Sequence, residues 1–223
     1  MTDKPELTAI DVLLNPDEIL IKKAFEVNER LRYEFSKGFK LDESHVPHIT
    51  ILQRYVRTTD LEKVFDAVKN VISSENVASL QLTAVKIECI ASEGSLGLAA
   101  IVISPTKDLL NFQSKLIDAL NPYIEKNGTS TAYYVAPEED PNINEATLEY
   151  VENYIPDHSG KNFVPHVTVG VNTIESLEKI SNEPFTPLKS SPVGIAVYHL
   201  GNYGTARKVL KEWNLSQMNR KHG

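Results

Sequence analysis

The sequence is poor in the features that mark disulfide-stabilised, secreted and membrane proteins. Cys89 is the only cysteine among 223 residues, so the chain can form neither an intramolecular disulfide nor a cysteine-based metal cluster. Residues 1–6 contain no apolar signal core, and no apolar run reaches the length that a membrane-spanning helix requires. We therefore expect a cytoplasmic protein that does not associate with membranes.

The remaining composition is that of an ordinary globular protein with an acidic balance. Apolar residues make up 41% of the chain and charged residues 24%. The net charge of −7 argues against a general nucleic-acid coat protein. Segment 138–157 has seven acidic residues and no Lys or Arg, whereas segment 189–223 has six basic residues and one acid. We interpret these segments as a solvated acidic helix and a basic hairpin, and leave open whether the acidic segment covers a site.

A five-residue pattern occurs twice in the chain. Val46–Thr50 is Val-Pro-His-Ile-Thr and Val164–Thr168 is Val-Pro-His-Val-Thr, with the histidines 166 − 48 = 118 positions apart. β-Branched residues and a residue before proline favour extended backbone, so both copies predict strand starts. Residues i and i+2 of a strand point to the same side, about 6.6 Å apart. Each copy therefore predicts an imidazole and a hydroxyl on one face.

Regular alternation also predicts which later residues share that face. Leu52 and Arg54 should follow the first histidine, and Gly170 and Asn172 should follow the second. The intervening apolar residues should face the core, namely Ile49, Ile51, Val167, Val169 and Val171.

Hydrophobic periodicity predicts alternating strands and helices. Strands are expected at 7–14, 48–56, 80–90, 96–103, 132–136, 166–172 and 194–200, the last continuing into a hairpin arm at 205–215. Helices are expected at 17–35, 60–72, 105–123, 144–154 and 173–180. A helix thus follows each motif strand, as in a duplicated architecture. The predicted fold class is α+β, with antiparallel or mixed sheets and helices on their outer faces.

The motifs and their surroundings resemble the two-histidine (2H) phosphoesterase superfamily, which includes 2′,3′-cyclic nucleotide phosphodiesterases and 2′-5′ RNA ligase-like proteins. The resemblance is carried by Leu41–Arg54, Ser159–Gly170 and Tyr198–Ala206, and it spans about residues 7–215. It implies one domain, 1–223, with two pseudo-symmetric lobes around a central cleft, in which the motif strands near 48–56 and 166–172 face each other. It also implies that neither a metal nor a nucleotide cofactor is needed.

The two histidines and two threonines are the candidate catalytic residues. Opening a cyclic phosphodiester requires a deprotonated nucleophile and a protonated leaving oxygen, and imidazole, with a pKa of about 6.5, suits both tasks. By analogy with the family, His166 is the base and His48 the acid. Thr50 and Thr168 can donate to phosphate oxygens. Arg54, if the strand stays regular, is a candidate phosphate-binding residue; the alternative is a surface arginine in a salt bridge.

Three functions remain open. The leading one is metal-independent hydrolysis of 2′,3′-cyclic phosphates on nucleotides or RNA ends. The second is 2′-5′ ligation or cleavage of RNA ends with the same histidines. The third is a catalytically silent module that binds nucleotide ends. We expect a monomer with no obligate protein partner.

Several other residues have a less specific pattern. A metal site would need ligands from His45, His158, His199 or the acidic segment, and their spacing does not favour one. Tyr133, Tyr134 and Tyr203 are interpreted as core or rim residues, with stacking on a base as the alternative.

Overall fold

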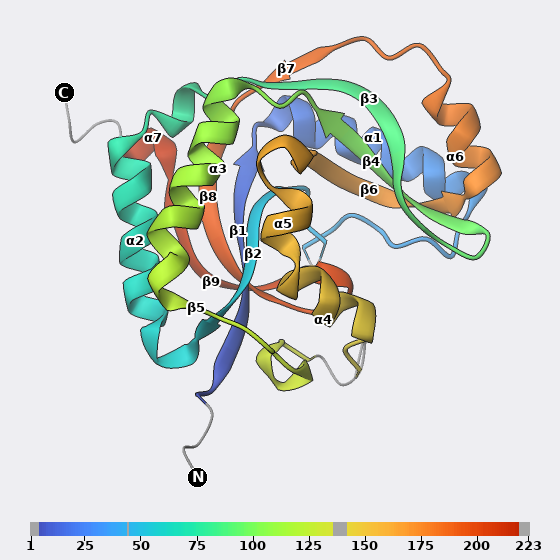
Figure 1. Ribbon diagram of the computed structural model, residues 1–223. Coiled ribbons are helices and arrows are strands. Elements are labelled where there is room, and N and C mark those ends of the chain that lie inside the picture. Colours follow the sequence, from blue (N-terminus) through green and yellow to red (C-terminus); the bar gives the residue numbers. More distant parts are fainter. Residues whose placement is uncertain (1–4, 44, 136–141, 219–223) are drawn as a thin grey trace.

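The computed structural model describes residues 5–43, 45–135 and 142–218, which form two antiparallel β-sheets with helices packed against them (Figure 1). The five-stranded sheet has the order β5-β2-β1-β8-β9, formed by Ile124–Glu125, Ile49–Arg57, Leu7–Pro16, Pro192–Leu200 and Ala206–Asn214. The four-stranded sheet has the order β6-β4-β3-β7, formed by His166–Thr173, Leu96–Ile103, Leu82–Glu93 and Leu188–Ser190. The predicted α+β class is confirmed.

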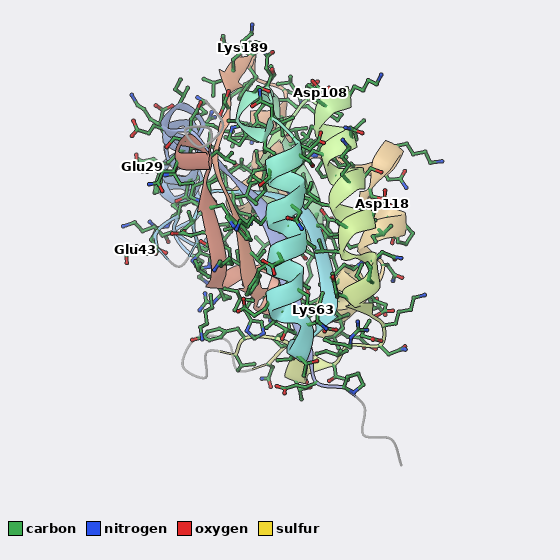
Figure 2. The ribbon with its side chains drawn as sticks, turned by 90° about the vertical axis from the view of Figure 1, so that its left-hand side faces the viewer. Glu29, Glu43, Lys63, Asp108, Asp118 and Lys189 are labelled. Atoms are coloured by element: carbon green, nitrogen blue, oxygen red, sulfur yellow. The ribbon has the colours of Figure 1, made fainter. Side chains whose placement is uncertain are left out.

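The longer helices cover both sheets. Helices α2 (Leu61–Ser74) and α3 (Lys107–Leu120) pack against each other, and Figure 2 shows them side by side with charged residues such as Lys63 and Asp118 on the outside. Helix α1 (Glu18–Glu34) packs on β6, and α6 (Ile174–Ser181) packs on β3. The remaining helices are α4 (Glu145–Glu152), α5 (Tyr154–His158) and α7 (Leu215–Met218).

Helix starts follow from short polar side chains placed before apolar stripes. Asp17, directly after a proline, accepts the backbone N–H groups of Ile19 and Leu20, both at 3.2 Å, and so caps α1. Asn144 caps α4 and Thr173 caps α6 in the same way. A helix follows each motif strand as predicted, but only α6 has a side-chain cap; α2 follows the 3-10 turn Thr58–Asp60 without one.

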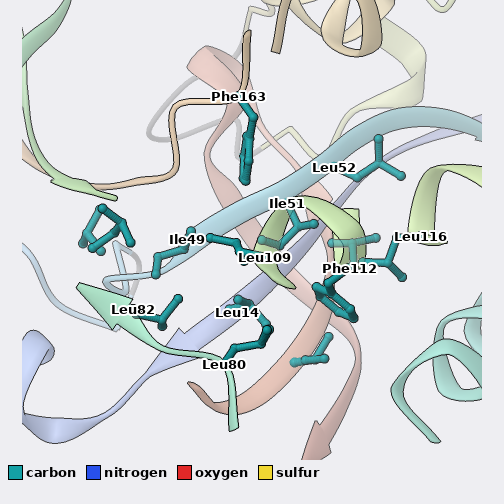
Figure 3. Packing of buried hydrophobic residues seen from close by; sticks show 14 of the residues in the cluster. Leu14, Ile49, Ile51, Leu52, Leu80, Leu82, Leu109, Phe112, Leu116 and Phe163 are labelled. Carbon is teal, nitrogen blue, oxygen red and sulfur yellow. The ribbon is translucent and has the colours of Figure 1, made fainter. Parts of the chain in front are cut away.

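A continuous apolar core joins the two sheets to their helices. Figure 3 shows part of it, where Leu14 of β1 and Ile49, Ile51 and Leu52 of β2 lie close to Leu109, Phe112 and Leu116 of α3. The same core includes Val167 and Val169 of β6 and Leu31 of α1. Burial of this apolar surface is the main stabilising contribution, and it fixes the two motif strands relative to one another.

The two halves share one order of elements, with an exchange of helices. The order β1-α1-β2-α2 in the first half corresponds to β4-α3-β6-α6 in the second. Helix α1 nevertheless packs on β6, the motif strand of the second half, whereas α3 packs on β2, the motif strand of the first. Each half therefore supplies a helix to the other half's motif strand.

One predicted strand is wrong, and two short strands have no counterpart in the prediction. The segment Ser130–Ala132 forms a 3-10 turn, and Tyr133–Val135 is irregular; Ala136, the end of the predicted strand, lies outside the described residues. The Tyr133 side chain is buried, with its hydroxyl 2.6 Å from that of Tyr55, so its burial outweighs the local strand propensity. Strands β5 and β7 are too short for periodicity to detect. Within the described ranges, every helix is too short or too polar to cross a membrane.

Candidate active site

The two motif strands meet where the sheets adjoin. Strand β6 is the edge of the four-stranded sheet and packs against β2 of the five-stranded sheet. Each histidine stands at the start of its strand, and the two are close enough that His48 helps to lower the pKa of His166. The fold therefore brings together the two histidines that the repeated motif predicts as a pair.

Both histidine rings are held by the same backbone contact. Nδ1 of His48 lies 2.7 Å from the carbonyl oxygen of Val46, and Nδ1 of His166 lies 2.7 Å from that of Val164. A carbonyl oxygen only accepts hydrogen bonds, so Nδ1 carries a hydrogen and donates it. This contact fixes the tautomer and leaves Nε2 of each ring as the nitrogen available for proton transfer.

Each motif strand contains a β-bulge three residues after its histidine. In β2, Thr50 pairs with Leu13 and Leu52 with Val12, so Ile51 is the extra residue. In β6, Thr168 pairs with Ala100 and Gly170 with Ala99, so Val169 is the extra residue. The repeat thus extends from the sequence pattern to an irregularity of the backbone.

The bulges reverse the alternation that a regular strand predicts. In β2, Gln53 pairs with Asp11 and lies on the face of Thr50, while Arg54 pairs with the core residue Ile10. The expectation that Leu52 and Arg54 share the face of His48 and Thr50 is therefore wrong. Nη1 of Arg54 donates to the carbonyls of Val151, at 3.2 Å, and Glu152, at 2.8 Å, at the end of α4. A role for Arg54 in binding phosphate stays a prediction.

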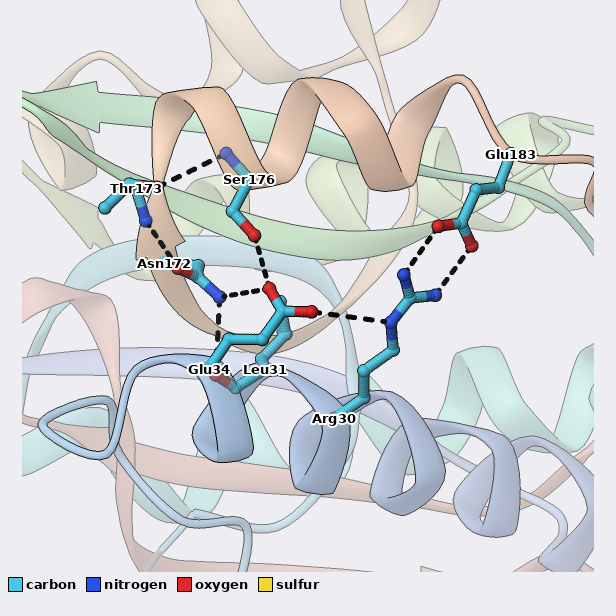
Figure 4. A network of polar contacts seen from close by, with 7 residues as sticks. All are labelled: Arg30, Leu31, Glu34, Asn172, Thr173, Ser176 and Glu183. Atoms are coloured by element: carbon cyan, nitrogen blue, oxygen red, sulfur yellow. Dashed lines mark hydrogen bonds and ion pairs between the residues drawn. The ribbon is translucent and has the colours of Figure 1, made fainter.

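The same correction applies to the second strand. A Cβ on Gly170 would lie 2.9 Å from Cδ1 of Leu31 in α1, so this position faces the helix and not the motif face. Figure 4 shows Asn172 pointing toward α1, where its Nδ2 donates to the carbonyl of Leu31 at 3.3 Å and lies 3.4 Å from Glu34 Oε2. Gly170 and Asn172 are thus part of the packing between α1 and β6.

Asp11 is a fully buried carboxylate beside the first motif. Its Oδ2 accepts from the hydroxyl of Thr50 at 2.8 Å and from Nε2 of Gln53 at 3.0 Å, and it lies 3.9 Å from Nε2 of His48. Its Oδ1 is buried and has no hydrogen-bond partner in the described part of the chain. Burial raises the pKa of Asp11, and the attraction of His48 and the two hydrogen bonds oppose this increase.

The second motif has a different environment. Burial lowers the pKa of His166; the hydrogen bond to Val164 opposes this effect, and the neighbouring His48 and His158 add to it. The position that corresponds to Asp11 is Leu98, because Leu98 pairs with Val171, five residues after His166, as Asp11 pairs with Gln53, five residues after His48. The hydroxyl of Thr168 has no hydrogen-bond partner among the described residues. The two motifs therefore share geometry but not electrostatics.

Helices α4 and α5 contribute a cluster of three aromatic rings beside the site, Tyr150, Tyr154 and His158, in tilted and edge-to-face contact. The ring centroids of Tyr150 and His158 are 4.4 Å apart, and that of Tyr154 lies 5.4 Å from His158. Burial raises the pKa of Tyr150 to about 12, with a smaller contribution from the negative charge of Asp11. The described part of the acidic segment thus lies beside the two motifs; residues 138–141 lie outside the described residues.

Most of the other candidate side chains contact neighbouring residues of the fold, whereas Tyr203 is exposed. His45 stacks on Phe39 with centroids 5.2 Å apart, and Nε2 of His199 lies 2.9 Å from the carbonyl oxygen of Ala132. Tyr133 is buried, whereas Tyr203 is 73% exposed. No group of three or more His, Cys, Asp or Glu side chains in the described ranges could hold a metal ion.

Four polar residues of the site were not found by sequence reasoning. Asp11 lies in an apolar strand, Gln53 follows the first motif, and Asn28 and Gln113 lie on buried faces of α1 and α3. The signal for Asp11, Asn28 and Gln113 is a polar residue in an otherwise apolar stripe, which must find a partner when buried. Gln53 gives no such signal, because the bulge that places its side chain on the motif face is not visible in the sequence.

Comparisons with known proteins support the fold. No protein-family model and no curated protein matches the sequence. Among solved structures, the crystal structure of TT0787 of Thermus thermophilus matches with a TM-score of 0.53 and 15% identity, over 93% of this chain and 98% of that chain. E. coli LigT complexed with NADP+ or 3′-AMP matches with a TM-score of 0.44 and 14% identity, over 95% of this chain and all of LigT.

A likeness at 15% identity concerns the fold and not the activity. The LigT likeness, with its lower TM-score, adds no inference about substrate. The chain is therefore similar in fold to TT0787, with two antiparallel sheets that bring the two His-x-Thr strands together.

Proposed function

We propose that this protein hydrolyses 2′,3′-cyclic phosphates of nucleotides or RNA ends, with His48 and His166 as acid and base and without a metal. The observation that supports it most strongly is the matched tethering of both rings through Nδ1, which directs two Nε2 atoms to proton transfer. A cyclic phosphodiester needs two such groups, one at the attacking oxygen and one at the leaving oxygen.

The different environments of the motifs support one assignment of roles. Burial favours neutral His166, so its Nε2 accepts a proton from water as the water oxygen attacks phosphorus. Oδ2 of Asp11 lies 3.9 Å from Nε2 of His48, and the attraction of His48 opposes the rise that burial causes in the pKa of Asp11, so we assign the acid role to His48. His48 then gives its Nε2 proton to the ribose oxygen as the phosphorus–oxygen bond breaks. The product is a phosphomonoester, and both histidines exchange protons with solvent to reset the site.

The two threonines are not equivalent as phosphate donors. Thr50 gives its single hydroxyl hydrogen to Asp11 at 2.8 Å, so it can donate to phosphate only when Asp11 takes up a proton. The hydroxyl of Thr168 can donate to a non-bridging phosphate oxygen with no rearrangement. We therefore assign the main stabilisation of phosphate charge to Thr168.

The test is an assay with chelator present, on 2′,3′-cyclic mononucleotides, on oligonucleotides ending in a cyclic phosphate, and on 2′-5′-linked oligonucleotides. Products are followed by phosphorus NMR. We expect ring opening that is abolished by His48→Ala and by His166→Ala and retained by His45→Ala, a loop histidine that stacks on Phe39.

Each other outcome contradicts part of the proposal. Full activity of either motif variant would exclude the two-histidine mechanism, and loss with chelator would show that a metal is needed. Turnover of the 2′-5′ linkage alone would favour the RNA-end hypothesis. Binding of nucleotide without turnover of any substrate would favour a silent binding module.

A further inference from the structure

Two buried amide side chains occupy equivalent places in the two halves. Asn28 in α1 is 2% exposed and Gln113 in α3 is 1% exposed, each among apolar neighbours of its helix. A buried amide is stable only when its N–H and C=O groups are paired, so its partners show what it connects.

Asn28 binds three backbone groups of two distant segments. Its Nδ2 donates to the carbonyl of the bulge residue Val169 at 2.8 Å and to the carbonyl of Phe39 at 3.0 Å. Its Oδ1 accepts the N–H of Leu41 at 3.1 Å. Leu41 lies seven residues before His48, in the segment that leads into the first motif.

Gln113 makes the same three contacts in the other half. Its Nε2 donates to the carbonyl of the bulge residue Ile51 at 3.0 Å and to the carbonyl of His158 at 3.2 Å. Its Oε1 accepts the N–H of Gly160 at 3.1 Å. In both cases the amide binds the carbonyl of one residue ahead of a motif and the N–H of the residue two positions later.

We call each set a brace: Asn28 with Phe39, Leu41 and Val169, and Gln113 with His158, Gly160 and Ile51. Each brace connects the bulge of one motif strand to the segment that leads into the other motif. This crossing is possible because α1 lies on β6 and α3 lies on β2. The position of each histidine is therefore fixed both from its own strand and from the preceding loop.

We propose that Asn28 and Gln113 are positioning residues that set the placement of His48 relative to His166. This inference rests on the proposed function, because an in-line proton-transfer pair requires both rings to be placed accurately. Displacement of a catalytic group by about 1 Å can lower a rate by about 100-fold. The hydrogen bonds of both amides go to backbone groups, so both residues act through the backbone.

The test uses variants that remove the donors in two ways. Gln113→Met has a similar length and removes all three contacts, while Gln113→Glu keeps an acceptor for Gly160 and loses the donors to Ile51 and His158. Asn28→Leu and Asn28→Asp do the same for the other brace. Leu177→Ala, a buried residue of α6 outside both braces, is the control for general loss of stability.

We expect kcat to fall on the order of 10- to 100-fold in the brace variants, with KM nearly unchanged, well below their melting temperatures. The Nδ1–H signals of both histidines should shift in NMR spectra, and the amide of Leu41 or Gly160 should exchange faster. The control should lose melting temperature but keep kcat and the ring signals.

A brace variant that loses melting temperature like the control, with unchanged kcat and unchanged ring signals, would show a merely structural role. The ring signals separate this inference from the proposed function. If the wild-type protein turns over no cyclic phosphate, shifted ring signals in the brace variants still support positioning, whereas unshifted signals overturn it.

Discussion

The carboxylate of Asp11 lies 3.9 Å from Nε2 of His48, and the corresponding position beside His166 holds Leu98. A repeated motif gives two rings with the same tether, and a single buried acid in one half makes them different. The two histidine rings therefore have the same backbone contact but differ in the charged group beside them.

The pH dependence of kcat/KM should be bell-shaped. The base must be neutral, so the rate rises with pH through the pKa of His166, which burial holds below 6.5. The rate falls again at higher pH, because the leaving oxygen must receive a proton from the catalytic acid. The measurement is a pH–rate profile on a cyclic mononucleotide; a rate that only reaches a plateau with rising pH would contradict the acid role of His48.

Asp11→Asn should make the protein more stable at neutral pH and less active. The folded-state pKa of Asp11 is raised above 3.8, so its stabilising contribution is present below that pH and is lost as the buried group ionises at higher pH. Asparagine stays uncharged. We expect Tm to rise by about 2–4 °C, the change that about 1 kcal/mol causes in a protein of this size.

Thermal unfolding of both proteins at several pH values tests the stability effect of Asp11. The gain of the Asn variant over the wild type should increase with pH, because only the wild type carries a buried charge. An equal difference at every pH would mean that packing, and not ionisation, determines the effect.

Thr168→Val and Thr50→Val should have different effects on activity and on stability. Thr168→Val removes a free hydroxyl and should lower kcat/KM by about 10-fold or more, the effect of a lost hydrogen bond to a charged group. Thr50→Val removes a donor to Asp11, so it should reduce stability more and activity less. Parallel kinetics and melting curves measure both effects; equal losses of activity in both variants would mean that Thr50 also donates to phosphate.

Arg54→Met should reduce stability and leave KM nearly unchanged. The side chain is 9% exposed, and its loss leaves two carbonyls at the end of α4 without their donor, which costs about 1–3 kcal/mol. Denaturant unfolding and steady-state kinetics measure the two effects. A large rise in KM that Arg54→Lys reverses would instead support the phosphate-binding role predicted from regular alternation.

Much of the fold follows from the sequence because long amphipathic segments carry their own signal. The spacing of apolar residues predicts α1, α2 and α3 within a few residues of their ends, and β-branched motifs predict the starts of β2 and β6. Two copies of one pattern predict the pair of histidines. These features depend on local backbone preference and on which face is apolar, and both can be read from neighbouring residues.

The rest depends on contacts between distant segments. Segment 132–135 is not a strand because Tyr133 is buried against Tyr55, which is 78 positions away. The bulges at Ile51 and Val169 leave no mark in the sequence, since both are β-branched residues suited to a regular strand. The partners of Asp11 and Gln113 come from other elements, so their roles become visible only when the chain is folded.

The bulge in β2 reverses the alternation of side chains between the two faces of the strand. Before Ile51, the even-numbered Thr50 lies on the face of Asp11. After Ile51, the odd-numbered Gln53 lies on that face and contacts Asp11, and the even-numbered Arg54 points to the end of α4. Deleting Ile51 would restore regular alternation, so Gln53 and Arg54 would exchange faces although neither residue is substituted. In this strand, the number of residues between two positions determines their function as much as the residues themselves.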